Sequence, residues 1–459
     1  MSKRDDDPLR ELRSEGDLNI SPARDAWLQQ HVDEETRRWL EKDARYFLHQ
    51  SLSTPCLDVL AGASGSSLEN LQGKRYLDFH GNNVHQVGFG NRRVVDAIRA
   101  TMDVLPFSPR RFTNIPAIRL AEKLARIAPG DLEKVLFAPG GTSAVGIALK
   151  LARVATGRFK TISMWDSFHG ASLDAISVGG EALFRKGVGP LLPGTEHVPP
   201  PDARHCPWDC GGECNLKCAE YIEYVLEKEG DVGAVIAETV RSTPYFPPPD
   251  YWKTVRKACD RHGALLILDE IPHCLGRTGK MFSCEHYGIV PDMLVIGKGL
   301  GGGIFPLAAL LARRDLDVAR DQALGHYTHE KNPVACAAAL AALESLEEDG
   351  LLENARRLGE RALGRMETLK RQRPLVGDVR GLGLLLGIEL IRPESGERAV
   401  EEAEKVLYAA LERGLSFKVS MGNVLTLCPP LSVSQGELDR AFDILDEVIG
   451  EIGESDAPT

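Results

Sequence analysis

The sequence predicts an α/β fold, with a large domain built on a mostly parallel sheet sandwiched by helices and a smaller α+β domain. From about residue 132 to residue 311, short apolar runs alternate with helical patterns, which is typical of parallel strands joined by helices. A hydrophobic content of 43% and a charged content of 26% are ordinary for a globular protein. A chain of 459 residues is long enough for one large domain and a smaller one.

Residues 1–90 are expected to contribute to the smaller domain and to a subunit interface. The first 30 or so residues are polar, and we expect them to fray or to lie on a partner. Residues 33–48 have helical periodicity, and residues 76–79 have the pattern of a strand.

Residues 91–340 are expected to form the large domain. Helical periodicity covers residues 94–104 and 117–127, and a helix over 332–346 is expected to lead out of the domain. The strands of its sheet are predicted at six apolar runs: 135–137, 161–164, 234–237, 265–268, 294–296 and 307–311.

Residues 341–459 are expected to complete the smaller domain, because strands and helices are mixed there without regular alternation. The predicted strands are 383–390, 415–419 and 424–427, and the predicted helices are 399–412 and 434–452.

The charge and the apolar pattern exclude some classes of protein. A net charge of −11 argues against nucleic acid as the principal partner, although clustered arginines can still attract a small anion. No apolar run has the length of a membrane span, and the charged segment 1–7 has no apolar core after it. We therefore expect a cytoplasmic protein without a signal peptide.

The most informative motif is a pair of apolar strands that each end in a polar residue. The run 264–268 is followed by Asp269 and Glu270, and the run 293–296 is followed by Lys298 between two glycines. Pyridoxal 5'-phosphate (PLP) needs a lysine that binds its aldehyde and a carboxylate that keeps its pyridine nitrogen protonated. Glycines beside the lysine allow a ligand to approach the backbone. Lys298 and Asp269 are therefore the predicted catalytic residues of a PLP site.

Three further segments have the residue types that such a cofactor needs. Gly141 and Thr142 open a helix after a strand, where free N–H groups would hold a phosphate, although a plain strand-to-helix turn has the same pattern. Phe168 and His169 follow another strand and would place a ring against a flat cofactor, the alternative being a core phenylalanine. Thr328 would supply another phosphate hydroxyl.

Together these segments resemble the class III aminotransferases, PLP enzymes of fold type I, over roughly residues 60–450. The resemblance implies that Lys298 binds the cofactor covalently and that Asp269 pairs with the pyridine nitrogen. It also implies a homodimer with shared active sites, because the family supplies the threonine matched by Thr328 from the other subunit. The other cofactor-binding positions that it implies are Gly141, Thr142, Phe168, His169, Glu238 and Ile271.

Two departures from the family pattern concern the reaction. Pro272 replaces a glutamine that bonds the cofactor's phenolic oxygen, and the neighbouring His273 is either its substitute or a surface histidine. Thr426 stands where aminotransferases that use glutamate carry an arginine that clamps a carboxylate. The usual amino acceptor therefore lacks its anchor.

Other residues are expected to bind the substrate. Arg110 and Arg111 lie on a proline-stiffened loop, residues 105–114. They are either solvated surface charges or, if the flanking phenylalanines bury them in part, a binding site for a phosphate or phosphonate. The polar run 79–88 is either a simple turn or a substrate loop, with Asn82 and His85 as its candidate binding residues.

These features are similar to those of the family's ammonia-lyases, and they imply a small anionic amine as substrate. The expected reaction is elimination from a hydroxylated aminoethylphosphonate, giving an aldehyde and ammonia without a second substrate. The alternative is an ω-type aminotransferase that passes the amine to a keto acid, and a third possibility is a phospholyase that releases phosphate.

Cysteines recur every four residues between 206 and 218, beside His205. Four thiols in this pattern either hold zinc, or less readily an iron–sulfur cluster, or remain free, since the usual zinc pairs are separated by two residues. No metal is expected at the catalytic site. The four residues are Cys206, Cys210, Cys214 and Cys218.

Overall fold

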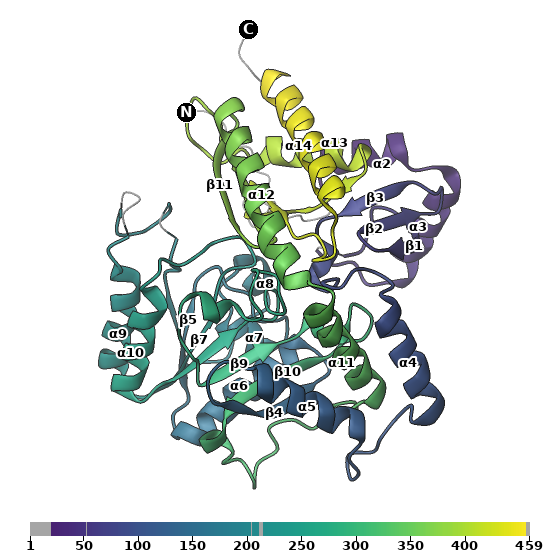
Figure 1. Cartoon of the computed structure of the whole chain (residues 1–459). Helices are drawn as coiled ribbons and strands as arrows, with labels where there is room; N and C mark the ends of the chain where they lie inside the picture. Colours follow the sequence, from purple (N-terminus) through teal and green to yellow (C-terminus); the bar gives the residue numbers. More distant parts are fainter. Residues whose placement is uncertain (1–19, 52, 203, 211–213, 456–459) are drawn as a thin grey trace. The chain divides into compact units, whose positions relative to one another are not determined.

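The computed structural model describes residues 20–51, 53–202, 204–210 and 214–455 (Figure 1). The chain divides into two compact units. The first contains the described residues up to Gly81, Gly88–Gly90 and the residues from Asn354 onward, and the second contains Asn82–Val87 and Asn91–Glu353.

A seven-stranded sheet forms the centre of the second unit. Its strand order is β4-β10-β9-β8-β7-β5-β6, and every neighbouring pair is parallel except the two that involve β10. This confirms the predicted α/β fold with a mostly parallel sheet. The short edge strand β6 was not predicted, because its sequence has little apolar character. The strands are β4 (Leu132–Ala138), β5 (Lys160–Met164), β6 (Thr195–Val198), β7 (Val232–Glu238), β8 (Leu265–Asp269), β9 (Met293–Ile296) and β10 (Ala308–Arg313).

Both faces of this sheet are covered. Ile267 and Leu266 are neighbours in β8 and point to opposite faces, yet each is 0% exposed. On one face α6 (Gly141–Thr156) joins the apolar core of β7, β9 and β10. The helices α9 (Lys217–Glu229) and α10 (Tyr251–His262) lie side by side, as Figure 1 shows, and pack near β6 and β8. Because both faces are covered, the central strands of this sheet are apolar along almost their whole length.

Three helices that pack together complete the second unit, and each begins at an asparagine. Asn91, Asn114 and Asn332 accept a hydrogen bond from the backbone N–H three residues later, which satisfies one free donor of each helix. The helices are α4 (Arg92–Val104), α5 (Ile115–Ile127) and α11 (Pro333–Glu348), and the shorter elements nearby are α7 (Leu173–Val178), α8 (Ala182–Arg185), η1 (Gly81–Asn83), η2 (Ser283–His286), η3 (Lys298–Gly301) and η4 (Arg314–Leu316).

The first unit contains two four-stranded sheets, with strand orders β1-β2-β3-β13 and β11-β12-β15-β14. The predicted strand 415–419 is divided between them, because its first two residues pair with β3 and residues from Lys418 pair with β15. The strands are β1 (Leu60–Ser64), β2 (Ser67–Asn70), β3 (Arg75–Asp78), β11 (Val376–Leu382), β12 (Leu385–Leu390), β13 (Leu415–Ser416), β14 (Lys418–Ser420) and β15 (Val424–Leu427). The helices are α2 (Pro22–His31), α3 (Glu34–Tyr46), α12 (Leu351–Gln372), α13 (Val400–Glu412) and α14 (Gln435–Ser455).

The prediction that the first 30 residues fray is wrong for the part that the structure describes, while residues 1–19 lie outside the described residues. Ser21 caps α2 by accepting from Arg24 N, and Pro22 is its first residue. Trp27 is 5% exposed and packs against Tyr408 of α13. The apolar contacts of one tryptophan therefore fix a segment whose overall composition is polar.

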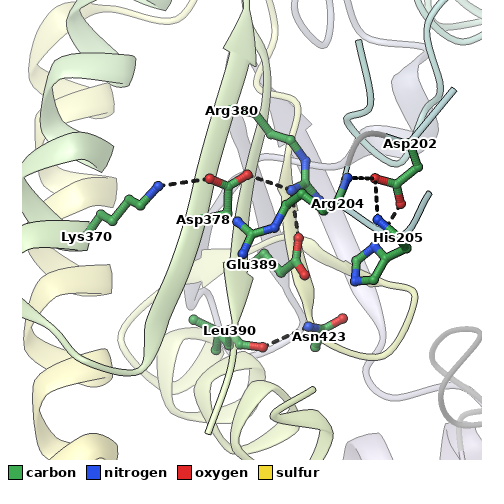
Figure 2. Close-up of polar contacts among 9 residues, drawn as sticks. All are labelled: Asp202, Arg204, His205, Lys370, Asp378, Arg380, Glu389, Leu390 and Asn423. Carbon is green, nitrogen blue, oxygen red and sulfur yellow. Dashed lines mark hydrogen bonds and ion pairs between the residues drawn. The ribbon is translucent and has the colours of Figure 1, made fainter. Parts of the chain in front are cut away.

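A half-buried ion network joins α12 to β11 and β12 within the first unit (Figure 2). Arg380 donates to Asp378 at 3.0 Å and to Glu389 at 2.7 Å, and Lys370 reaches the other oxygen of Asp378 at 2.9 Å. The Arg380 side chain is 12% exposed, so its charge needs both carboxylates.

No described helix of the chain is long and apolar enough to cross a membrane.

Candidate active site

The carboxyl ends of three neighbouring parallel strands bring the predicted catalytic residues to one edge of the sheet. Glu238 at the end of β7 is in register with Asp269 at the end of β8, and Asp269 is in register with Val295 of β9. Lys298 follows β9 after one glycine and begins η3 with a φ of +47°, a conformation that side chains rarely adopt. The topology therefore places Asp269 and Lys298 beside one another at the strand ends.

Asp269 is held by a buried histidine. Its Oδ2 accepts a hydrogen bond from His169 Nδ1 at 2.8 Å, and its Oδ1 accepts from Ile271 N at 3.0 Å. Both side chains are at most 2% exposed, and His169 Nε2 has no partner among the described residues. His169 was predicted to bind the cofactor directly, and no local pattern indicates that it supports Asp269.

Ile271 connects the lysine turn to the start of α6. A Cβ atom added at Gly141 would lie 2.6 Å from Ile271 Cδ1, and one added at Gly297 would lie 3.4 Å from Ile271 Cγ2. Any larger residue at 141 would therefore displace Ile271, and this one apolar side chain lies between the predicted phosphate-binding turn and the turn that carries Lys298. The structure brings these predicted residues together.

The N-terminus of α6 has the features of an anion site. Its cap is Gly140, and no side chain caps the first-turn N–H groups. A Cβ atom at Gly170 would overlap Thr142 Oγ1, so the turn that carries Phe168 and His169 lies against this helix start. A flat, phosphorylated cofactor would find an anion-binding helix start and an aromatic residue close together here.

Phe168 is open to solvent on one side rather than packed in the core. Its ring is 37% exposed, with its centroid 4.5 Å from that of Phe184 in α8, so the core interpretation is wrong. Its backbone N–H donates to Glu238 Oε1 at 3.2 Å, and Ser242 N donates to Glu238 Oε2 at 3.0 Å. Glu238 therefore fixes the backbone that presents the ring, and Phe184 is a contact that the sequence analysis missed.

Glu270 supports the site from inside the protein. It is 0% exposed and accepts hydrogen bonds from Thr239 Oγ1 at 2.8 Å, Ser283 N at 2.6 Å and Cys284 N at 2.7 Å. Burial raises the pKa of its carboxyl to about 7. Because alternate residues of a strand point to opposite sides, Asp269 bonds His169 while Glu270 bonds the backbone of Ser283 and Cys284.

His273 is 0% exposed, so the surface alternative is wrong. Ser283 Oγ donates to His273 O at 3.1 Å and lies 3.0 Å from His273 Nδ1, so Nδ1 carries the imidazole proton. His273 Nε2 has no partner among the described residues. Burial lowers the pKa of His273 to about 4, the charge of Glu238 opposes this shift, and the charge of Lys298 adds to it. A neutral imidazole therefore lies in the electrostatic environment of Lys298.

The polar loop after β3 lies against the lysine turn. A Cβ atom at Gly303 would lie 3.2 Å from Val84 O and 3.7 Å from His85 Cα, and one at Gly299 would overlap the side-chain amide of Gln86. His85 is 0% exposed, whereas Asn82 is exposed. The loop is therefore close to Lys298, as the substrate-loop interpretation requires. Gln86, whose amide atoms have no partner among the described residues, was not predicted.

Arg110 and Arg111 are both exposed in the single chain, and the expected partial burial is wrong there, since Phe112 is 63% exposed. Their loop packs against the segment that carries Thr328. Arg110 contacts His326, the rings of Phe107 and His329 are 5.3 Å apart, and Asn114 Nδ2 donates to Lys331 O at 2.9 Å. The arginine loop and the segment that carries Thr328, which were predicted separately, therefore form one exposed group of side chains.

Thr426, the residue in place of the carboxylate-clamping arginine, is buried in β15 and donates to Ser420 Oγ at 3.1 Å. Its hydroxyl is thus bound within its own sheet.

The cysteine run gives no support for zinc. Cys206 Sγ lies 3.0 Å from Cys210 Sγ, but across the described ranges no group of three or more His, Cys, Asp or Glu side chains is arranged to hold a metal ion.

Known proteins are similar to this chain over nearly its whole length. The family model for class III aminotransferases matches residues 50–449. The (R)-1-hydroxy-2-aminoethylphosphonate ammonia-lyase of Vibrio splendidus is 48% identical over 96% of both chains, and the leucine/methionine racemase of Thermococcus litoralis is 36% identical over 90% of this chain and 96% of its own.

Solved structures agree with this assignment. An aminotransferase from Bacillus anthracis superposes with a TM-score of 0.84 at 31% identity, covering 91% of this chain and 99% of its own. An amine transaminase from an uncultivated Pseudomonas species, solved in a PLP-bound form, has a TM-score of 0.82 at 29% identity, covering 88% and 98%. Members of this family use PLP. The chain belongs to the class III aminotransferase family.

Proposed function

We propose that this chain is a PLP-dependent ammonia-lyase that converts (R)-1-hydroxy-2-aminoethylphosphonate to phosphonoacetaldehyde and ammonia. The observation that carries the proposal is the 48% identity, over 96% of both chains, to the Vibrio splendidus enzyme of that activity. The threonine at position 426 supports it, since a lyase needs no anchor for a second, keto-acid substrate.

The residues at the strand ends fit PLP. Gly141 and Thr142 would bind its phosphate at the uncapped start of α6, while Phe168 and Ile271 would cover the two faces of its ring. Lys298 is the amine that would hold it covalently, and the Asp269–His169 pair would face its pyridine nitrogen. PLP supplies an electron-accepting ring that stabilises negative charge on the carbon next to the substrate nitrogen.

Lys298 is the general base of the proposed reaction. Its amine would take the proton from the carbon that carries nitrogen. Asp269, fixed by His169 and by Ile271 N, would pair with the ring nitrogen. Loss of hydroxide from the neighbouring carbon, with a proton, releases one water. Hydrolysis of the product consumes one water, so substrate is converted to one aldehyde and one ammonia.

Arg110 and Arg111 are the proposed phosphonate anchors, because paired guanidinium groups match a doubly charged group. We place them in the active site of a neighbouring subunit, together with Thr328, because their loop contacts His329 and Lys331 in the segment that carries Thr328. The exposed apolar residues around this loop support a homodimer that covers them: Val104 is 84%, Phe112 63% and Ile115 64% exposed. Asn82 and His85 are proposed to lie near the departing hydroxyl.

The discriminating experiment incubates PLP-saturated protein with the aminophosphonate and no keto acid. Continued release of ammonia over many turnovers supports the lyase. A single turnover that stops until pyruvate is added contradicts the lyase and supports an aminotransferase. A parallel incubation with an amino-alcohol phosphate tests for a phospholyase: release of inorganic phosphate from that ester, with no ammonia from the aminophosphonate, also rejects the proposal.

The aminotransferase is the second candidate. It is favoured by the structural neighbours, which are amine transaminases with TM-scores between 0.82 and 0.85. These relatives are 28–29% identical, well below the ammonia-lyase, so we rank it second.

A further inference from the structure

Two cysteines between β6 and α9 have their sulfur atoms close together. Cys206 Sγ lies 3.0 Å from Cys210 Sγ, about 1 Å longer than the bond of a disulfide. Both residues are free thiols and half-buried, so a small reagent can reach them. Nothing in the proposed reaction uses them.

The backbone around the pair is held by local contacts. Before Cys206, the amides of Arg204 and His205 donate to Asp202 Oδ1 at 3.0 and 3.4 Å, and His205 Nδ1 lies 2.8 Å from Asp202 Oδ2 (Figure 2). Between the cysteines, Asp209 N donates to Cys206 O at 3.0 Å. The ring of Trp208 lies 5.7 Å from that of Tyr221 in α9, which anchors the turn. The pair is thus positioned by its surroundings.

Other cysteines lack this combination of proximity and access. Burial raises the pKa of Cys218, Cys259 and Cys336 to about 12, which keeps these thiols protonated and unreactive. Cys214 shares the segment and the half-buried environment and provides the matched control for Cys206 and Cys210.

We propose that Cys206 and Cys210 form a redox-active dithiol that a low-molecular-weight disulfide oxidises reversibly to an intramolecular disulfide. One thiolate attacks the reagent and displaces one reduced thiol, leaving a mixed disulfide. The second thiolate attacks the protein sulfur of that mixed disulfide and displaces a second reduced thiol. The chain loses two electrons and two protons, and the reagent gains them. This proposal is independent of the proposed function.

The test treats the PLP-saturated protein with oxidised glutathione and measures its intact mass. A loss of about 2 Da that is reversed by dithiothreitol, with the link mapped to Cys206 and Cys210, supports the proposal. Cys206→Ser and Cys210→Ser are each expected to stop at a glutathione adduct, while Cys214→Ser still forms the link. Circular dichroism checks that every variant is folded.

Three results would overturn the proposal: an unchanged mass, a link that uses another cysteine, or a link that survives in Cys210→Ser. Zinc at about one ion per chain in freshly purified protein, lost in Cys206→Ser, would also overturn it, because the thiols would then be metal ligands.

Discussion

The strand ends that carry Asp269 and Lys298 differ in burial from the loop that carries Arg110 and Arg111. At the strand ends, Asp269 is 1% exposed and is held by His169 at 2.8 Å. The arginines are exposed, and their loop packs on another exposed segment. The proposed catalytic residues are therefore enclosed within each chain, whereas the proposed substrate contacts lie on exposed surface.

The largest effect is expected from Lys298→Ala, because Lys298 begins η3 directly after β9 and is the proposed attachment site of the cofactor. Turnover should fall by ~10⁴-fold or more, since both covalent attachment and proton removal are lost. The purified variant should also lack the absorbance of the bound cofactor. Lys280→Ala, at an exposed lysine nearby in the sequence, is the control and should keep both.

Asp269→Asn tests whether the buried carboxylate acts through its charge. The amide has the same shape but cannot hold a proton on the ring nitrogen, so kcat should fall by ~10²-fold while KM changes little. Steady-state ammonia release measures this. An unaltered kcat would show that the carboxylate has no electrostatic role and that the strand ends are only a scaffold.

The arginine loop should affect substrate binding rather than the chemical step. Arg110→Ala and Arg111→Ala should each lower kcat/KM by about 10- to 100-fold, the worth of a charge-assisted bond. Most of the loss should appear in KM for the phosphonate. A substrate in which hydrogen replaces the phosphonate should be insensitive to both changes.

Mixed dimers test whether these arginines act in the partner's site. Refolding Lys298→Ala together with the double variant Arg110→Ala/Arg111→Ala at equal amounts places an intact lysine opposite intact arginines in half of all dimers. Activity should return to about a quarter of the wild-type value if the arginines serve the neighbouring subunit. No recovery would place the arginines in their own chain's site.

The smallest effect is expected in the pH dependence of the free energy of unfolding, and it comes from His273 in the buried region. The pKa of His273 falls from its ordinary value near 6.5 to about 4 in the folded chain, so the unfolded chain binds more protons between these values. Stability should therefore fall as pH falls from 6.5 through 4, by on the order of 3 kcal/mol. His273→Asn should flatten the pH dependence of urea unfolding in this window, and exposed His49→Asn should not.

The sequence predicted those parts of the fold in which a pattern is repeated and strong. Apolar runs gave the positions of the central strands, and Lys298 and Asp269 were recognisable because each follows such a run. The split of residues 415–419 between two sheets was not predictable, because both halves are equally apolar and only pairing partners separate them. The ordered α2 depends on a contact between Trp27 and Tyr408, which are far apart in the sequence.

Some contacts of the candidate site could be predicted from the sequence and others could not, for a similar reason. Positions that match a family motif, such as Gly141 and Ile271, are brought together by the structure. The partnership of His169 with Asp269 and the position of Gln86 depend on side-chain direction across 100 or more residues of sequence, which no local pattern encodes. The exposure of the arginines could not be judged without the fold, because flanking aromatic residues occur both in cores and at interfaces.

The contact of Gln86 with Gly299 has an evolutionary consequence. Since a methyl group at position 299 would overlap the amide of Gln86, a residue larger than glycine is accepted after the lysine only if that amide turns away or position 86 becomes shorter. Among homologues, replacements at 299 should therefore occur together with a change of residue or of side-chain direction at 86.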